Sequence, residues 1–152
     1  MKIINGNLIE LAKQNYFDVV VHGCNCFCTM GSGIAKQIAH HFPLAKEADL
    51  ATEKGNRYKL GIYSYAYISE YDLIIINAYI QYRYGWNKVH ADMNAIRNIF
   101  NNLKQHLSGK RFGLPRIGAG HAKGNWNEIS KIIEEELYDE DVTLVNYLKG
   151  NL

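Results

Sequence analysis

Two short runs of branched apolar residues constrain this chain most. Val19-Val20-Val21 and Leu73-Ile74-Ile75-Ile76 contain no polar residue that would mark a solvent-facing side. Strands that are apolar on both faces are typical of parallel sheets covered by helices on each side. A chain built around such strands must also supply amphipathic helices to cover them.

The sequence supplies these helices. Apolar residues spaced three or four apart predict helices over residues 34–42, 93–107 and 126–137. Asn125 and Glu128 stand three apart at the start of the last one, as in a capping box. Strands are expected over residues 2–5, 18–22, 60–68, 73–76, 112–114 and 142–147. Strands that alternate with helices predict a three-layer α/β/α architecture, and the 152 residues fit a single domain over 1–152.

Composition excludes several other classes. The chain is 47% hydrophobic and 21% charged, as is usual for a globular protein. The net charge of +2 comes from scattered basic residues, which does not indicate a nucleic-acid partner. We expect no signal peptide and no membrane span, because no apolar run approaches the roughly 20 residues that a spanning helix needs. Three cysteines without a secretion signal predict reduced thiols and a cytoplasmic location.

Two glycine-rich segments lie where α/β folds bind ligands, beyond the carboxyl ends of the strands. Residues 22–34 and 115–120 each follow a buried strand and precede a helix. Glycines let the backbone approach a ligand, and exposed N–H groups at a helix start attract anions. Together, the two segments predict a pyrophosphate-binding site. The alternative is that these glycines only make tight turns. Neither segment is a Walker A motif or a GxGxxG motif.

Taken together, these motifs resemble the macro domain family. The similar segments, in chain order, are Asn5-Gly6-Asn7-Leu8, Val21 to Cys26, Met30 to Ala35, Leu114 to Gly120, Gly124-Asn125-Trp126 and Asp141 to Tyr147. The resemblance covers nearly the whole chain and is strongest to the branch of ADP-ribose 1''-phosphate phosphatases and the terminal ADP-ribose protein glycohydrolase. It implies a macro domain with a central mixed, mostly parallel sheet. It also implies a small-molecule nucleotide ligand, ADP-ribose or a derivative, and no cofactor.

The resemblance also implies where the ligand lies. Asn7 would face the adenine next to Leu8, in a place where most of the family has Asp, and Asn25 would hydrogen-bond the distal ribose. Tyr147 would either stack on the adenine or close the edge of the core, and His121 would reach the same cavity. The phosphates would be held by Gly31, Ser32, Gly33 and Ile34 and by Ile117, Gly118, Ala119 and Gly120.

The residue types narrow the expected reaction. Ala35 and Ala122 stand where glycohydrolase members of the family carry Asp, so cleavage of a glycosidic bond by those two mechanisms is not expected. His22 is shared with the resembling phosphatases, and an imidazole can move protons near neutral pH. The sequence therefore predicts hydrolysis of ADP-ribose 1''-phosphate to ADP-ribose and phosphate. In this hypothesis His22 is the general acid or base and Asn25 orients the ribose; the alternative is that His22 is a buried structural histidine.

Other functions stay open on the sequence alone. The chain could be a non-catalytic ADP-ribose-binding module, or a hydrolase of ADP-ribosylated macromolecules or of O-acetyl-ADP-ribose. Arg83, in the segment 81–85, is either a phosphate partner in a flap or part of an exposed loop. We expect no metal site, because Cys24, Cys26 and Cys28 are spaced too closely for a zinc cluster and no second cysteine pair exists.

Overall fold

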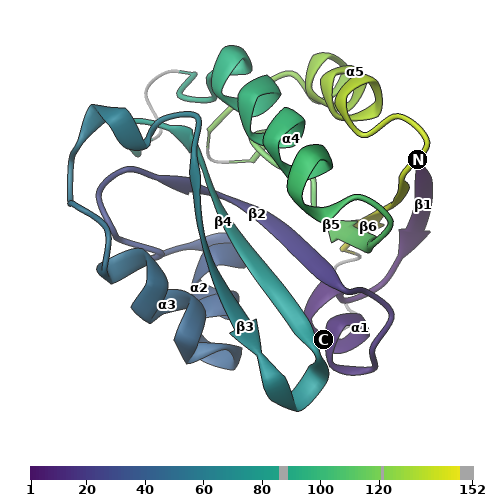
Figure 1. Cartoon of the computed structure of the whole chain (residues 1–152). Helices are drawn as coiled ribbons and strands as arrows, with labels where there is room; N and C mark the ends of the chain where they lie inside the picture. The colour runs from purple at the N-terminus through teal and green to yellow at the C-terminus, as the bar shows by residue number, and fades with distance from the viewer. Residues whose placement is uncertain (86–88, 121, 148–152) are drawn as a thin grey trace.

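The computed structural model of the chain describes residues 1–85, 89–120 and 122–147. Within these ranges, strands alternate with helices along the chain (Figure 1). In order, the elements are β1 (Lys2–Asn5), α1 (Leu8–Lys13), β2 (Val19–Asn25), α2 (Gly33–His41), α3 (Pro43–Leu50), β3 (Tyr63–Ile68), β4 (Leu73–Gln81), α4 (Met93–Leu107), β5 (Arg111–Leu114), α5 (Trp126–Glu136) and β6 (Asp141–Asn146), with short 3-10 helices η1 (Arg57–Lys59) and η2 (Ser69–Tyr71).

The six strands form one sheet in the order β1-β6-β5-β2-β4-β3. Every neighbouring pair is parallel except β3 and β4, which are antiparallel. β2 lies inside the sheet between β4 and β5, and its residues Val19 to Val21 are at most 1% exposed. The sheet is therefore mixed and mostly parallel, and the expectation of strands buried on both faces is confirmed for β2.

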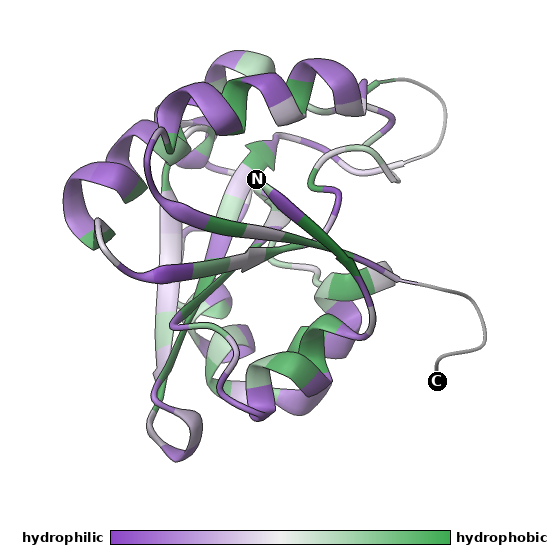
Figure 2. Ribbon diagram, turned by 90° about the vertical axis from the view of Figure 1, so that its right-hand side faces the viewer, coloured by the Kyte–Doolittle hydropathy of each residue, from purple (hydrophilic) through white to green (hydrophobic). Residues whose placement is uncertain are grey.

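Helices cover both faces of this sheet. α4 and α5 pack on one face, and α1, α2 and α3 pack on the other (Figure 1). Hydrophobic residues gather in the strands, whereas the helices alternate hydrophobic and hydrophilic residues along their length (Figure 2). These layers confirm the predicted three-layer α/β/α fold. No helix among the described residues combines the length and the apolar character needed to cross a membrane.

The boundaries differ from the predicted ones at several places. The helices α1 and α3 were not expected; Asn7 caps the first, and Pro43 begins the second. The strand predicted to end at His22 continues to Asn25, because β4 also continues to Gln81 and supplies hydrogen-bonding partners up to a bulge between Cys24 and Asn25. At the start of α5, Asn125 Oδ1 accepts from Asn127 and Glu128 N–H groups, which confirms the predicted N-cap.

One close contact limits the side chains that β5 can accommodate. Gly113, in the middle of this strand, lies directly against the ring of Phe17, which precedes β2 and is buried. A Cβ atom at Gly113 would come within 2.5 to 2.7 Å of three atoms of that ring. The position therefore has no room for a side chain unless Phe17 moves.

We expect Gly113→Ala to lower the free energy of unfolding by about 1–3 kcal/mol, the usual cost of an overpacked core. Urea denaturation of the variant and the wild type measures this difference. Gly31→Ala serves as the control, because the nearest atom to its added Cβ would be 3.8 Å away. Equal stability of the two variants would contradict the packing argument.

Candidate functional site

A cavity of about 480 Å³ opens at the carboxyl ends of β2, β4 and β5. This volume falls within the range of roughly 300–1,000 Å³ that is usual for small-molecule sites. Its position, at the edge where parallel strands end, is where α/β folds bind ligands. The cavity is lined by residues 23–25, 29–35, 49, 80, 81, 84, 85, 115–118, 120 and 122.

The first wall is the loop between β2 and α2, residues 26–32, which we call the first loop. Asn25 shapes this loop, because its Oδ1 accepts from Phe27 N–H at 2.8 Å and its Nδ2 donates to Thr29 Oγ1 at 2.7 Å. Lys46 Nζ also donates to the Thr29 carbonyl at 2.7 Å. The loop ends at Gly33, which has φ of +58° and begins α2, so the positive end of that helix lies at the cavity.

The second wall is the loop at residues 115–120, which we call the second loop. Gly118 has φ of +74°, a conformation that glycine adopts without strain. Gly124 N–H donates to the Gly118 carbonyl, and a Cβ atom at Gly124 would lie only 2.6 Å from that oxygen. Arg116 lines the cavity and holds its side chain in place by donating from Nε to Asn146 Oδ1 at 3.1 Å. This loop therefore contributes a fixed backbone and a positive charge.

The structure brings most of the predicted phosphate-binding residues to one cavity. Ala35 and Ala122, the two positions without a carboxylate, also lie on its wall. Ala119 is not among the lining residues, and His121 lies outside the described residues. The predicted residues that line the cavity are Asn25, Gly31, Ser32, Gly33, Ile34, Ile117, Gly118 and Gly120.

The residues predicted to contact adenine do not line this cavity. Asn5 pairs with Asn146, so Asn7 and Tyr147 follow neighbouring strands at the far edge of the sheet. Asn7 Oδ1 accepts from Glu10 N–H at 3.2 Å and so acts as the N-cap of α1. Leu8 is buried in the core, whereas Tyr147 is 47% exposed. An adenine there would extend beyond the cavity onto a more open surface.

His22 does not lie at the mouth of the site, and this expectation is corrected. Its side chain is 0% exposed and is absent from the cavity wall. The reason is that β2 continues three residues further, so His22 is an interior residue of the strand. Cys24, two residues along on the same face, reaches the cavity instead and lies 3.8 Å from the imidazole. Burial lowers the pKa of His22 to about 4, so the ring is neutral near pH 7.

Instead of facing the cavity, His22 begins a buried chain of hydrogen bonds. Its Nε2 lies 2.7 Å from Asn77 Oδ1, and Asn77 Nδ2 donates to Ser64 Oγ at 3.1 Å. Ser64 Oγ lies 2.8 Å from the Tyr79 hydroxyl, which donates to Asp49 Oδ1 at 2.8 Å. The Tyr79 hydroxyl has one hydrogen, which it donates to Asp49, so the Ser64 hydroxyl must donate to Tyr79. The Asn77 side-chain oxygen can only accept, so His22 Nε2 must carry a hydrogen. All four donors therefore point toward Asp49.

Asp49 is the residue that sequence reasoning missed. It lies near the end of α3, lines the cavity and is only 1% exposed. The signal was available, because Asp49 follows Phe42 and Ala45 by seven and four residues and so falls on the apolar face of the helix. A carboxylate in such a place requires a partner or a function.

The three cysteines lie close to the first loop, and burial affects two of their thiols. All three are free thiols. Burial raises the pKa of Cys24 well above its usual range and that of Cys26 to about 11, so both stay protonated. Lys59 Nζ donates to the Cys26 carbonyl at 3.0 Å and lies 3.4 Å from Cys28 Sγ, which braces the first loop. No group of three or more metal-ligating side chains occurs in residues 1–85, 89–120 and 122–147.

Only part of the segment 81–85 lies at the cavity. Tyr84 and Gly85 line the cavity, but Arg83 is not among the lining residues. Its guanidinium lies 5.5 Å from the ring centres of both Phe27 and Tyr82. Arg83 is therefore placed beside the rim of the cavity, stacked on aromatic rings.

The buried His22 predicts a loss of stability in mild acid. The unfolded chain takes up a proton at this ring near pH 6.5, whereas the folded protein does so only near pH 4. The unfolded state binds more protons in this window, so the free energy of unfolding falls by about 3 kcal/mol from pH 6.5 to 4. His22→Gln, which stays neutral and can still donate to Asn77, should remove this part of the pH dependence in urea denaturation.

Glu140→Gln is the control for this experiment. Hydrogen bonds from Gly109 N–H, Ser108 and Lys104 lower the pKa of Glu140 to about 2. Glu140 therefore changes the free energy of unfolding in the window from about pH 4.5 to 2. An unchanged slope between pH 6.5 and 4.5 in His22→Gln would contradict the assignment.

Comparisons with known proteins agree with the fold. No family model matches the sequence. The chain is 36% identical over 151 residues to an uncharacterized 17.5 kDa protein from the tk-vs intergenic region of Enterobacteria phage T4, covering 97% of this chain and 96% of that protein.

Solved structures of macrodomains have the same architecture. The macrodomain of Thermus aquaticus DarG superposes with a TM-score of 0.70 at 22% identity, covering 97% of each chain. Thermosipho africanus DarTG, solved in complex with ADP-ribose, gives a TM-score of 0.74 at 12% identity, covering 99% of this chain and 42% of that one. The chain therefore has the macrodomain fold and belongs to the same protein family as the 17.5 kDa protein of phage T4.

Proposed function

We propose that the cavity binds ADP-ribose or a close derivative of it. The observation that carries this proposal is the pair of glycine loops facing one another across a cavity of about 480 Å³. The start of α2 and the Arg116 guanidinium add positive charge to these two walls. A pyrophosphate carries two negative charges in a compact group and matches this arrangement. The T. africanus protein of the same fold, solved with ADP-ribose, supports the choice of nucleotide.

The order of the strands orients the proposed ligand. Asn7 and Tyr147 lie at the β1–β6 edge of the sheet, whereas Asn25 lies at the end of β2, two strands inside the opposite edge. With the adenine toward Asn7 and the phosphates between the two loops, the terminal ribose lies toward Asn25. Asn25 keeps hydrogen-bonding capacity for it, because each of its amide atoms uses only one contact within the first loop.

We further propose that the bound nucleotide is ADP-ribose 1''-phosphate and that the protein releases its terminal phosphate. In this reaction a water oxygen attacks phosphorus, and the bond from phosphorus to the ribose oxygen breaks. One proton of that water stays on the released phosphate, and the other is transferred to the ribose oxygen. Preorganised N–H groups of the loops and Arg116 would stabilise the charge that moves onto the phosphoryl oxygens. His22 is too deeply buried to exchange protons with the substrate directly.

A second candidate function is a binding module without catalysis. Two observations favour it: positions 35 and 122 on the cavity wall are alanines, and the imidazole expected to move protons lies outside the cavity. The same nucleotide would then be bound but not converted.

Binding is tested with Gly120→Val. Gly120 lines the cavity, and no atom lies within 4 Å of a Cβ added there. A branched side chain at this position should keep the ligand from the backbone of the second loop without disturbing the core. We expect the affinity for ADP-ribose in calorimetry to fall by at least about tenfold, as for the loss of one good contact, with the urea midpoint unchanged. Equal affinities of variant and wild type would place the ligand elsewhere.

Catalysis is tested by following inorganic phosphate released from ADP-ribose 1''-phosphate without added metal. We expect turnover by the wild type and a loss of about a hundredfold in Arg116→Ala, as for the removal of one charge-stabilising group. Arg97→Ala is the matched control, because Arg97 forms surface ion pairs with Glu135 and Glu136 on α5. Tight binding of the substrate by the wild type with no phosphate release would leave the binding module as the function.

A further inference from the structure

One oxygen of Asp49 has no partner among the residues that the structure describes. Tyr79 donates to Asp49 Oδ1, but Oδ2 is buried and accepts no hydrogen bond from any described residue. Leaving a buried carboxylate oxygen unpaired costs free energy, and such an atom in a native protein requires an explanation. Because Asp49 also lines the cavity, the missing donor can come from a bound ligand.

No cationic side chain in the described part of the chain provides this donor. Among the described residues, the four ion pairs use the acids Asp18, Glu135, Glu136 and Glu140, and none uses Asp49. Lys59 and Asp49 both act electrostatically on Cys24, but the Lys59 ammonium group donates to the Cys26 carbonyl and contacts Cys28 Sγ. A metal ion does not fit either, because no group of three metal-ligating side chains lies in the described part of the chain. A hydrogen-bond donor from outside the described residues, such as a ligand hydroxyl, fits Asp49 Oδ2.

The position of Asp49 selects the part of the ligand that meets it. α3 packs against β3 and β4, at the edge of the sheet opposite to β1 and β6. The anion-binding walls are the two glycine loops, and a phosphate next to Asp49 would be repelled by the carboxylate. Hydroxyl donors of a sugar fit this end of the cavity, and a phosphate on the same sugar would have to lie toward the glycine loops.

We propose that Asp49 is a ligand-contacting residue whose Oδ2 accepts a hydrogen bond from a hydroxyl of the terminal ribose. This proposal rests on the binding of ADP-ribose and adds which part of the nucleotide contacts α3. The preceding hydrogen-bond chain fixes the carboxylate, because Tyr79 holds Oδ1 and so directs Oδ2. Burial raises the pKa of Tyr79, which keeps its hydroxyl protonated as a donor.

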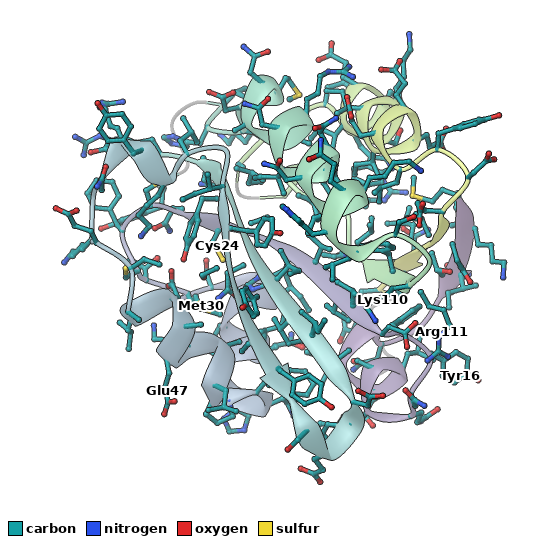
Figure 3. All side chains as sticks on the ribbon, viewed as in Figure 1. Tyr16, Cys24, Met30, Glu47, Lys110 and Arg111 are labelled. Carbon is teal, nitrogen blue, oxygen red and sulfur yellow. The ribbon has the colours of Figure 1, made fainter. Side chains whose placement is uncertain are left out.

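Helix α3 offers a matched control. Glu47 lies two residues before Asp49, and its side chain extends from the helix away from the sheet (Figure 3). It is exposed, whereas Asp49 is buried. Glu47→Gln and Asp49→Asn therefore remove the same charge from the same helix, but only the second alters the cavity wall.

The experiment compares ADP-ribose with ADP, which lacks the terminal ribose. Both ligands are titrated by calorimetry into the wild type, Asp49→Asn, Asp49→Ala and Glu47→Gln. We expect both Asp49 variants to bind ADP-ribose about tenfold to a hundredfold more weakly, as for the loss of a hydrogen bond to a charged group. Their affinity for ADP should stay unchanged or rise, because a negative charge is removed. Glu47→Gln should bind both ligands as the wild type does.

The outcomes separate this proposal from the proposed function. If the wild type binds ADP-ribose and the Asp49 variants lose affinity for both ligands equally, Asp49 acts only on the structure and the proposal is overturned. Unchanged affinities in both Asp49 variants overturn it as well. If the wild type binds neither nucleotide, the proposed function itself fails, and this inference fails with it. Asp49→Asn has the same shape as the native residue and can still accept from Tyr79, so it is the variant expected to retain the fold.

Discussion

The hydrogen bond between His22 and Asn77 is the contact on which the site depends. Asn77 lies in β4 and uses its amide to join four elements: it accepts from His22 in β2 and donates to the Ala45 carbonyl in α3 and to Ser64 in β3. Buried polar groups of this kind are costly unless every atom is paired, and here each atom of the amide has a partner. The network therefore fixes α3 against the sheet next to the cavity.

This arrangement gives the two sides of the cavity opposite character. The second loop carries Arg116, and the first loop leads to the positive end of α2. The wall formed by α3 carries the buried carboxylate of Asp49 instead. A ligand that fits both sides has an anionic middle and a sugar whose hydroxyls meet Asp49. The separation of charge, and not the volume of the cavity alone, makes a nucleoside diphosphate linked to a sugar the best match.

The fold could be predicted from the sequence because its central strands are unambiguous. Val19-Val20-Val21 can hardly be placed anywhere except inside a covered sheet, and the long apolar stripe of α4 has one interpretation. The short helices α1 and α3 were missed because they span only six and eight residues, too few for a clear periodic pattern. In α3, a polar residue on the apolar face weakened that pattern further.

Some parts of the site could be predicted from the sequence and others could not, for a physical reason. Glycine loops are a local feature, so the sequence located most of both cavity walls correctly. The position of His22 depends instead on how far β2 continues, and the partner strand β4 extends the pairing through Asn25. Asp49 falls on the apolar face of α3, but it reaches the cavity only because α3 packs beside β3 and β4, and a local pattern does not contain that packing.

The buried position of His22 explains why a histidine is suited to this place. A buried imidazole that stays neutral donates from Nε2, and this donor sets the direction of the chain through Asn77, Ser64 and Tyr79. Each hydrogen bond in such a chain polarises the next, and the chain ends on a carboxylate oxygen, the strongest acceptor available. The series that begins at His22 therefore fixes the Asp49 carboxylate through its Oδ1. A residue that does not touch the substrate can in this way determine how a residue on the cavity wall meets it.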